Sequence, residues 1–523
     1  MKTSRMIFSG SKKVLWAGLL LLVAILACSI ADYQVTEWVT ETPVQLASAT
    51  YTQLPTFTPT ASATSEPPTP TIPAVEFRGS PTPDAVRPTP QFRDTAETHV
   101  VRYGDTLNNL AKQYGVAISQ IQEVNGIQDP NLLSIGQVLI IPPPTPQAPG
   151  PNYKVIPDSE LVYGPSAIDL DSIFAVISPE GPLANYWEEV ENETLDGPAI
   201  LQIVTENYSV NPRLLLAILE FQSRWVRGDS QELGFDLYPI GWYDPAKKGL
   251  FSQLSWAADQ LNAGFYRWRA GWIGPFVFPD GRVVPPGPGV NAGTVSVQYL
   301  FSQLYSVEEW RQVIDENGFS LTYESLFGIP FEQAIEPLIP PDLVQPPLEL
   351  PFERGVQWSF TGGPHSAFGN NNEWAALDFA PSSNTPGCNP SGEWVVAAAD
   401  GIVVRSERGQ VIQDLGEDGN EQTGWVLFYL HIDTWERIPE GTTLNVGDKI
   451  GHPSCEGGIS TGTHLHIARK YNGVWINTDG AIPFDLGGWI PKSAGYPYEG
   501  SLIRGDEELR ACSCRASYNQ ISR

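Results

Sequence analysis

The stretch STGTHLH, at residues 460–466, determines how the C-terminal third of this chain is interpreted. His464 and His466 lie two residues apart, in a run that continues with Leu465, Ile467 and Ala468. Side chains at positions i and i+2 of a β-strand point to the same face, so both imidazoles would face one pocket. A lone His-x-His pair is a weak signal, because a polar strand face has the same pattern. Three further residues therefore decide the interpretation.

These three residues indicate a metal site. His431 ends the apolar run WVLFYLH at residues 425–431, and His365 follows a Gly-Gly-Pro turn. Asp378 lies in the apolar run WAALDF, where a buried carboxylate is costly unless it is paired or binds a metal. His365, Asp378 and His466 would make a two-histidine, one-carboxylate zinc site with an open position for water. His431 and His464 remain to act on that water and on a substrate.

Three segments resemble the β-lytic and staphylolytic branch of the lysostaphin-type zinc metallopeptidases. They are GGPHSAFGNNNEWAALDF at residues 362–379, YLHID at 429–433 and CEGGISTGTHLHIARKYNG at 455–473. Most members of that family space their first two ligands His-x-x-x-Asp, which here would need a histidine at Trp374. The β-lytic branch has twelve residues between them, as His365 and Asp378 do. The resemblance covers roughly residues 355–490.

The resemblance implies both an activity and roles for the five residues. Members of the family cleave peptide bonds in the cross-bridges of bacterial cell walls. The implied ligands of Zn²⁺ are His365, Asp378 and His466. The implied catalytic residues are His464, as the base toward water, and His431, which would stabilise the oxyanion or protonate the leaving amine.

Length and charge limit the possible classes of protein. A chain of 523 residues predicts about three domains. The net charge of −28, from 59 acidic and 31 basic residues, argues against a nucleic-acid partner and for an exported, soluble surface. Five cysteines are too few for a disulfide scaffold.

The N-terminus has the outline of an export signal. Lys2, Arg5, Lys12 and Lys13 precede the apolar run at residues 14–31. We interpret residues 1–31 as a signal peptide, lipoprotein signal or anchor. The sequence ILAC resembles a bacterial lipobox, in which Cys28 would be lipidated and attach the chain to a membrane. An uncleaved anchor and ordinary cleavage near Ala31 are the alternatives. Residues 32–96 are rich in Thr and Pro and predict a disordered stalk.

Residues 97–143 predict a small βααβ unit. A strand at residues 100–103 is followed by a turn, a helix capped by Thr106 and closed by Gly115, a second helix and a closing strand at 138–141. The unit resembles a LysM domain over its whole length. This resemblance implies binding to glycans that contain N-acetylglucosamine, such as peptidoglycan. His99, at the edge of the unit, is expected to be a surface residue.

Residues 152–335 predict a helical middle domain. Asn211 and Pro212 form a helix start, and a second helix begins near Gln253. The segment distantly resembles the start of lysozyme-like lytic transglycosylases, whose catalytic glutamate precedes a serine. Gln222 occupies that position here, and a neutral amide cannot act as a general acid. Glu220 is two residues earlier and would point elsewhere on the helix, so we predict a domain without glycosidase activity.

The remaining segments complete the predicted organisation. Residues 336–354 form a Pro-rich linker, residues 355–500 a mostly antiparallel β-sheet peptidase and residues 501–523 a C-terminal tail. Cys388 and Cys455 can form a disulfide in an exported domain. Cys512 and Cys514 are too close in sequence for an easy mutual bond. His452, which belongs to no motif, is expected to lie in a loop.

The resulting hypothesis is an exported, surface-tethered, multidomain zinc metalloendopeptidase. It would hydrolyse peptide bonds of peptidoglycan in the cell envelope, with the LysM unit binding the glycan. One alternative is a non-catalytic wall-binding or regulatory protein that uses the peptidase fold as a scaffold. Another is a secreted protease that acts on Gly-rich proteins.

Overall fold

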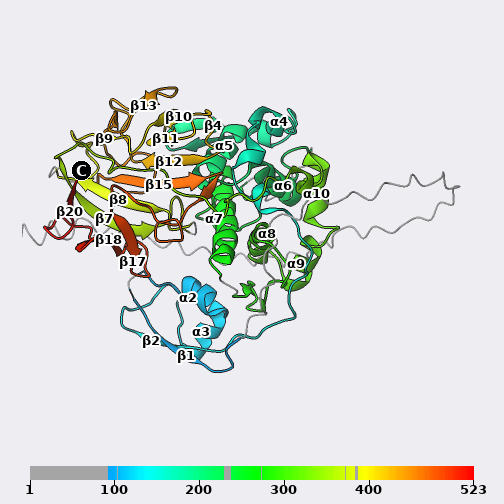
Figure 1. Cartoon of the computed structure of the whole chain (residues 1–523). Coiled ribbons are helices and arrows are strands. Elements are labelled where there is room, and N and C mark those ends of the chain that lie inside the picture. The colour runs from blue at the N-terminus through cyan, green and yellow to red at the C-terminus, as the bar shows by residue number, and fades with distance from the viewer. Residues whose placement is uncertain (1–91, 103, 229–236, 272–273, 371–372, 383–386) are drawn as a thin grey trace, which may run out of the picture. The chain divides into compact units, whose positions relative to one another are not determined.

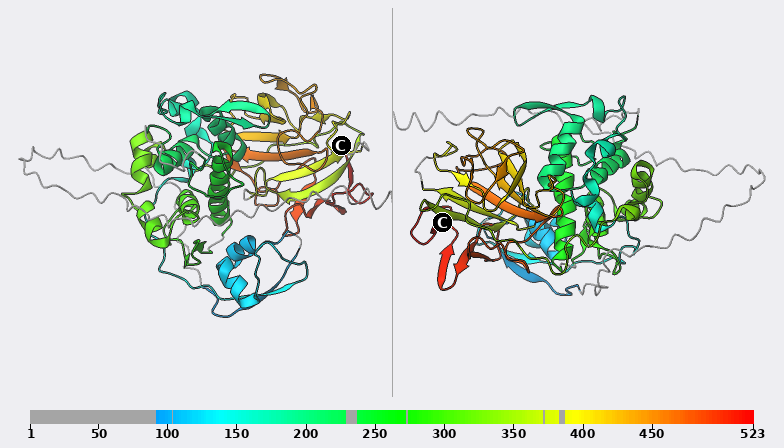
Figure 2. Two further views of the ribbon diagram at one scale, coloured as in Figure 1. Left: turned by 180° about the vertical axis from the view of Figure 1, so that it is seen from behind. Right: turned by 45° about the horizontal axis from the view of Figure 1, so that its top comes forward.

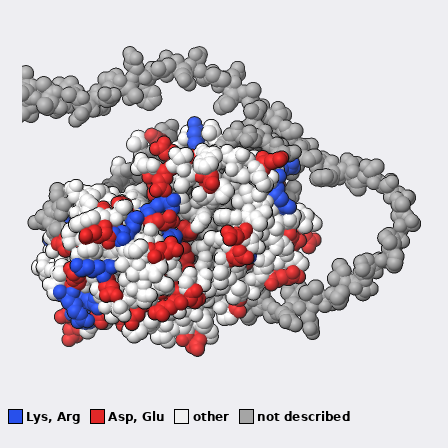
Figure 3. Space-filling view, turned by 90° about the horizontal axis from the view of Figure 1, so that it is seen from above, with Lys and Arg blue, Asp and Glu red and all other residues white. Residues whose placement is uncertain are grey.

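The computed structural model describes residues 92–102, 104–228, 237–271, 274–370, 373–382 and 387–523. The predicted signal or anchor and nearly all of the predicted stalk lie outside these residues. Among the helices that are described, none combines the length and apolarity needed to cross a bilayer. Acidic side chains are spread over the face of the molecule shown in Figure 3, with fewer basic ones between them.

The first described unit has the order strand, helix, helix, strand. Its two strands pair antiparallel, and a small apolar core lies between them and the helices. The Thr106 side chain accepts a hydrogen bond from the Asn109 amide, and Gly115 ends the helix in the left-handed conformation, with φ 65°. The elements are β1 (Glu97–Val100), α2 (Leu107–Tyr114), α3 (Ile118–Asn125) and β2 (Val138–Ile141).

Two details of this unit differ from the prediction. The first strand ends at Val100, where it was expected to begin. His99 is mostly buried rather than on the surface: its ring nitrogens lie 2.9 Å from the Tyr114 hydroxyl and 2.7 Å from Asp105 Oδ2. Its position opposite Leu139 in the strand pair holds it against the first helix.

The middle region is helical and has a large apolar core. Its α-helices are α4 (Leu170–Phe174), α5 (Gly197–Tyr208), α6 (Pro212–Ser223), α7 (Leu250–Arg269), α8 (Ala292–Ser302), α9 (Val307–Val313) and α10 (Phe319–Phe327). Four short 3-10 helices are η1 (Asp158–Glu160), η2 (Pro165–Ala167), η3 (Leu183–Asn185) and η4 (Pro330–Gln333). Two small hairpins are β3 (Trp187–Val190) with β4 (Glu193–Asp196), and β5 (Phe276–Val277) with β6 (Val283–Val284). Every residue of α8 is buried, because α7 and other helices surround it.

Glu220 and Gln222 are both engaged in structural hydrogen bonds. Asn211 caps α6 as predicted by accepting a bond from the Arg213 amide. Near the other end of α6, Glu220 Oε2 accepts bonds from the Val226 and Arg227 amides at 3.0 and 2.9 Å. The Gln222 amide nitrogen donates to the Ile240 carbonyl at 2.9 Å. These bonds hold both side chains in fixed positions at the end of α6.

The C-terminal region is built on one nine-stranded antiparallel sheet (Figure 1). The strand order is β13-β10-β11-β12-β15-β8-β7-β20, and β16 pairs with β15. Both further views again show these strands side by side (Figure 2). The bounds are β7 (Gln357–His365), β8 (Ala376–Pro381), β10 (Gly401–Glu407), β11 (Gln410–Asp414), β12 (Trp425–Leu430), β13 (Thr443–Leu444), β15 (Leu465–Tyr471), β16 (Val474–Trp475) and β20 (Gln520–Ser522). Smaller pairings involve β9 (Val395–Val396), β14 (Lys449–Gly451), β17 (Ile490–Ser493), β18 (Gly500–Arg504) and β19 (Glu507–Arg510).

The two faces of this sheet pack into different cores. Leu377, Leu427 and Ile467 point to one face, where they form the core of the C-terminal region itself. Ala376, Phe428 and Ala468 point to the other face and belong to the same apolar cluster as the helices of the middle region. Because side chains alternate along a strand, each central strand contributes to both cores.

Both ends of the predicted peptidase domain extend further than expected. The residues expected to form a tail include β18 and β19, and β20 pairs with β7 as an edge strand of the main sheet. Within the expected linker, Leu348, Leu350 and Phe352 are buried in the core of the C-terminal region. These apolar side chains alternate, which is a strand-like pattern that the surrounding prolines obscured.

Within the described residues, two disulfides are formed. Cys388 pairs with Cys455, as the sequence suggests. Cys512 also pairs with Cys514, so the expectation that they are too close is wrong. Their Cα atoms lie 5.0 Å apart, within the range of about 4.4–6.8 Å that a disulfide spans.

A buried cluster of charges lies between α5 and the main sheet. Glu421 accepts bonds from Arg405 Nε at 3.0 Å and from Lys470 Nζ at 2.9 Å, and Glu206 of α5 lies 3.6 Å from Arg405 Nε. Burial alone would raise the pKa of Glu421, but the two cations outweigh it and lower the pKa to about 2. Glu421 therefore stays ionised and pairs with both buried cations, while Glu206 provides a second carboxylate beside Arg405.

We expect Glu421→Gln to destabilise the protein by about 3–5 kcal/mol, the range typical when one partner of a buried ion pair is removed. Ionised Glu421 stabilises the fold above its ordinary pKa of 4.5, and this contribution should be lost as the pH falls toward 2. Urea unfolding at neutral pH measures the first effect, and its pH dependence measures the second.

The matched control is Glu508→Gln, which removes an exposed ion pair with Arg510. Exposed pairs contribute little, so this variant should unfold at nearly the same urea concentration as the natural protein. Equal unfolding midpoints for the Glu421 and Glu508 variants would contradict the role assigned to the buried cluster.

Candidate metal centre

Three adjacent strands bring His365, Asp378 and His466 together. His365 ends β7, Asp378 lies in β8 and His466 lies in β15. His466 is directly opposite Asp378 in the β15–β8 ladder, which places their side chains side by side on one face. All three residues are buried, and one ligand atom from each lies within 4.8 Å of the other two.

Backbone carbonyls determine which nitrogen of each imidazole faces this site. His365 Nδ1 lies 2.8 Å from the Gly363 carbonyl, and His466 Nε2 lies 2.9 Å from the Ala367 carbonyl. A carbonyl only accepts, so each of these nitrogens carries the hydrogen. In a neutral imidazole the other nitrogen is then a bare acceptor. His365 Nε2 and His466 Nδ1 are therefore both available as ligands.

The bare acceptor atoms converge on one point. His365 Nε2 and His466 Nδ1 lie 3.0 Å apart, and each is 3.2 Å from Asp378 Oδ1. Asp378 Oδ1 is buried without a geometrically satisfied hydrogen bond. Two imidazole lone pairs and an anionic oxygen at such distances repel one another unless a cation lies between them. This donor set fits Zn²⁺, which binds imidazole nitrogen and carboxylate oxygen.

Two more histidines lie beside these three residues. His431 follows β12 in the left-handed conformation, with φ 67°, and its ring centroid lies 4.5 Å from that of His464. His431 Nδ1 donates to the Glu456 carbonyl and His464 Nδ1 to the Gly462 carbonyl, each at 2.8 Å. Both Nε2 atoms are consequently bare in the neutral imidazoles. His464 Nε2 lies 3.6 Å from Asp378 Oδ1, at the edge of the site.

The protonation states favour a cation. Burial alone would raise the pKa of Asp378, but the neighbouring histidines, with His365 the strongest, hold it well below its ordinary value. Burial lowers the pKa of His466 more than the bond to Asp378 raises it. Burial, together with His464 and His466, lowers the pKa of His431 to about 3. At neutral pH the site therefore presents an anionic Asp378 carboxylate, and the lowered pKa values of His466 and His431 favour their neutral imidazoles.

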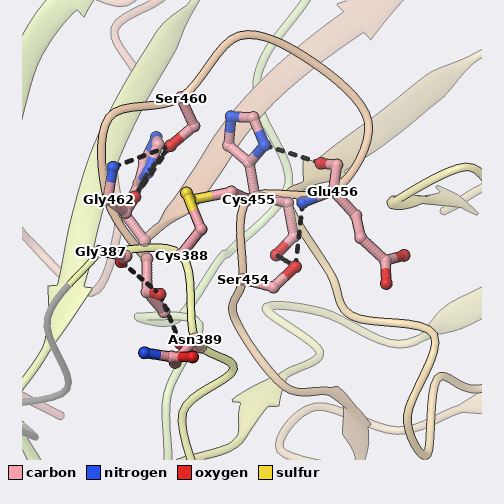
Figure 4. The surroundings of a disulfide bond; sticks show 11 residues. Gly387, Cys388, Asn389, Ser454, Cys455, Glu456, Ser460 and Gly462 are labelled. Atoms are coloured by element: carbon pink, nitrogen blue, oxygen red, sulfur yellow. Dashed lines mark hydrogen bonds between the residues drawn. A yellow bond between two sulfur atoms is a disulfide. The ribbon is translucent and has the colours of Figure 1, made fainter. Parts of the chain in front are cut away.

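A disulfide holds the loops around His431 and His464 (Figure 4). Cys388 joins the segment before β9 to Cys455, whose neighbour Glu456 provides the carbonyl bound by His431. The Thr463 hydroxyl donates to the carbonyls of Gly387 and Asn389, on the other side of the bridge. The bridge thus ties together the two loops that orient His431 and His464.

Tyr498 contacts a proposed metal ligand and was not predicted from the sequence. Tyr498, between β17 and β18, stacks on the His365 ring with the centroids 4.2 Å apart. Nothing in the motif pattern marks this residue, because it lies 133 positions after His365 and only the folding of the C-terminal hairpin brings it close. Its hydroxyl pKa is raised by burial and by Asp378, so the hydroxyl stays protonated.

His452 lies outside the centre. It was expected in a loop, and it does lie between regular elements, but it is buried between the rings of Trp394 and Trp435. Its Nδ1 lies 3.0 Å from the Glu393 carbonyl. Its role in the structure is packing.

Comparison with known families matches three parts of the chain. Residues 376–478 match Peptidase family M23, and residues 99–142 match the LysM domain. Residues 154–340 match the N-terminal domain of LasA. The M23 match contains Asp378, His431, His464 and His466, while His365 lies just before it.

Three curated relatives are similar to parts of this chain. Protease LasA of Pseudomonas aeruginosa is 27% identical over 294 residues, covering 52% of this chain and 66% of LasA, just under two thirds. The β-lytic metalloendopeptidase of Lysobacter enzymogenes is 28% identical over 159 residues, covering 30% of this chain and 85% of that protein. N-acetylmuramoyl-L-alanine amidase XlyA of Bacillus subtilis is 34% identical over 120 residues, covering 22% of this chain and 40% of the amidase.

Five alanine substitutions should fall into two classes of zinc content. His365→Ala, Asp378→Ala and His466→Ala should reduce bound zinc from about one per chain to nearly none, because each removes one of three proposed ligands. His431→Ala and His464→Ala should keep their zinc. Atomic absorption on protein dialysed against zinc-free buffer measures the difference.

Circular dichroism of each variant shows whether the chain has folded, so that a loss of zinc is not confused with unfolding. Retention of zinc by folded His365→Ala would show that the third ligand lies elsewhere. It would also show that the twelve residues between His365 and Asp378 do not identify His365 as a ligand.

Proposed function

We propose that this chain, which carries an M23 peptidase domain and a LysM domain, is an exported zinc metalloendopeptidase that hydrolyses peptide bonds in peptidoglycan cross-links. The observation that carries the proposal is the convergence of two bare imidazole nitrogens on the buried Asp378 carboxylate. The presence of His431 and His464 beside them supports catalysis over a purely structural use of the fold.

His365, Asp378 and His466 would hold the zinc ion. When bound there, zinc supplies a Lewis acid that polarises the scissile carbonyl and lowers the pKa of water. Gly362 permits this arrangement: a Cβ atom at that position would lie 2.4 Å from Asp378 Oδ2, so any larger residue would displace the carboxylate.

His464 is suited to remove a proton from the attacking water. Its Nδ1 hydrogen is committed to the Gly462 carbonyl, so the bare Nε2 can accept a proton. His464 Nε2 lies 3.6 Å from Asp378 Oδ1, so it is next to the position that a water on the proposed metal would occupy. This geometry supports the role of base.

His431 fits one of its two expected roles better than the other. Its Nδ1 donates to the Glu456 carbonyl and its Nε2 is bare, so neutral His431 has no hydrogen to offer an oxyanion. The His431 ring lies 4.5 Å from the His464 ring, so a proton that His464 takes from water could reach the bare Nε2 of His431 and pass to the leaving amine. The low pKa of His431, about 3, favours release of that proton rather than its retention. We therefore assign His431 to proton transfer rather than to oxyanion stabilisation by the neutral ring.

The LysM domain and the N-terminus support a cell-wall location. The resemblance to the LysM family implies binding to glycans with N-acetylglucosamine, which peptidoglycan contains, and the similar amidase XlyA is named for a muramoyl substrate. The two disulfides suit an oxidising compartment outside the cytoplasm. We propose that the chain is exported and tethered through its N-terminus, by a lipid on Cys28 or by an uncleaved anchor.

Mass spectrometry of purified cell walls incubated with the full chain tests the proposed reaction. We expect new free amines on cross-link peptides, with the glycan strands intact. His464→Ala should keep its zinc while turnover falls by about 10²–10⁴, the range typical of losing acid–base help. Release of sugar reducing ends without new amines would contradict the proposed bond specificity.

Deletion of the LysM domain should weaken wall binding. The full chain is expected to co-sediment with insoluble peptidoglycan, and a chain without residues 97–143 should remain mainly in the supernatant. Its zinc content serves as the control, because the metal centre does not include the deleted residues. Equal sedimentation of both chains would assign wall binding to another part of the protein.

A further inference from the structure

The loop between the first two metal ligands rests on the helical middle region. β7 ends at His365 and β8 begins at Ala376. Within the loop, the Phe368 ring packs edge-to-face on Tyr208 of α5, with centroids 5.2 Å apart. The Asn370 amide donates a hydrogen bond of 2.9 Å to Asp259 Oδ1 of α7. Two helices of the middle region thus contact residues 366–370.

Gly369 makes this contact close. Its φ of +69° is the left-handed conformation that glycine adopts without strain. A Cβ atom there would lie 2.7 Å from Tyr208 Cε1 and 2.8 Å from Asp259 Oδ1, nearer than real Cβ atoms approach. The loop backbone is therefore pressed directly against these two side chains, and little movement is possible without breaking the bond to Asp259.

The same loop orients a proposed metal ligand. Ala367 is fully buried, and its carbonyl accepts the hydrogen of His466 Nε2 at 2.9 Å. The Ala367 amide donates to the Glu373 carbonyl at 3.2 Å, which holds the peptide group on its other side. Because Nε2 carries the hydrogen, Nδ1 is left bare and faces Asp378. The position of the Ala367 carbonyl thus decides which nitrogen of His466 can bind a metal.

We infer that Asp259 of the middle region is a positioning residue for the metal centre. It acts through the Asn370 amide on the loop, and the Ala367 carbonyl of that loop fixes the orientation and tautomer of His466. The inference rests on the proposed metal site. It adds that the helical middle region helps to hold one ligand of that site in position. Groups that hydrogen-bond to metal ligands typically change metal affinity by about 10–100-fold when they are lost.

Two substitutions at Asp259 separate the hydrogen bond from general packing. Asp259→Asn keeps a side-chain oxygen that can accept the Asn370 amide, so it should retain near-natural zinc affinity. Asp259→Leu has a similar size and no acceptor, so its zinc dissociation constant should rise by up to about 10-fold, the lower end of the range for direct partners of metal ligands, because Asp259 acts on His466 only through the loop. Competition with a fluorescent zinc chelator measures the affinity of the full chain.

Tyr266→Phe is the matched control. Tyr266 lies on α7 as well, and its hydroxyl accepts the Trp475 amide at 3.0 Å, so this variant also loses one bond between α7 and the C-terminal region. Trp475 is not part of the 366–370 loop. We expect this variant to lose thermal stability while keeping its zinc affinity. Equal zinc affinities for Asp259→Leu and Tyr266→Phe would overturn the inference.

Nitrogen NMR of the histidine rings gives a readout that does not depend on activity. In the metal-free natural protein, His466 should carry its hydrogen on Nε2. In Asp259→Leu, a mixture of the Nε2-H and Nδ1-H tautomers should be seen. An unchanged tautomer in the folded leucine variant would overturn the positioning role. If the natural protein binds no zinc, the proposed function fails, while the tautomer measurement still decides whether Asp259 orients His466.

Discussion

The candidate metal centre depends on one buried carboxylate, that of Asp378. It faces two imidazole nitrogens that carry no hydrogen. Ionised carboxylates are costly to bury, and here no hydrogen-bond donor satisfies Oδ1 in the part of the chain that the structure describes. The surrounding carbonyls of Gly363 and Ala367 hold the imidazole hydrogens away from it. This geometry would be strained in a protein without a cation and is favourable in one that binds a metal.

The main sheet explains how that site can coexist with a stable core. One set of alternating side chains on β8, β12 and β15 forms the apolar core of the C-terminal region. The other set includes Asp378 and His466 and, further along the same strands, the residues that pack against the helices. The middle region therefore covers part of the face that carries the metal centre. The middle region contacts residues 366–370, and the Ala367 carbonyl of this loop accepts a hydrogen bond from His466.

Strand periodicity and motif spacing predicted much of the site. The His-x-His pattern brings His464 and His466 to one site, although His464 lies one residue before β15 and only His466 is part of that strand. The apolar run around Asp378 predicts the strand beside it. The pairing of His466 with Asp378 is a consequence of sheet register, which one sequence does not reveal. The carbonyls that fix each tautomer and the stacking of Tyr498 on His365 also depend on the folded backbone.

Other parts could not be predicted because local composition conceals long-range pairing. β20 is short and polar and forms only because β7 offers a free edge. Leu348 and Leu350 lie among prolines that indicate a linker, although the sheet core provides a site for their side chains. The bond between Cys512 and Cys514 requires a local bend that sequence separation alone does not indicate.

The central claim is that a metal ion binds between His365, Asp378 and His466. Anomalous diffraction at the zinc absorption edge, from crystals of the full chain grown with zinc, tests it directly. We expect one strong peak bonded to His365 Nε2, Asp378 Oδ1 and His466 Nδ1 at about 2.0–2.2 Å. A peak bonded to other residues, or none at this site under saturating zinc, would contradict it.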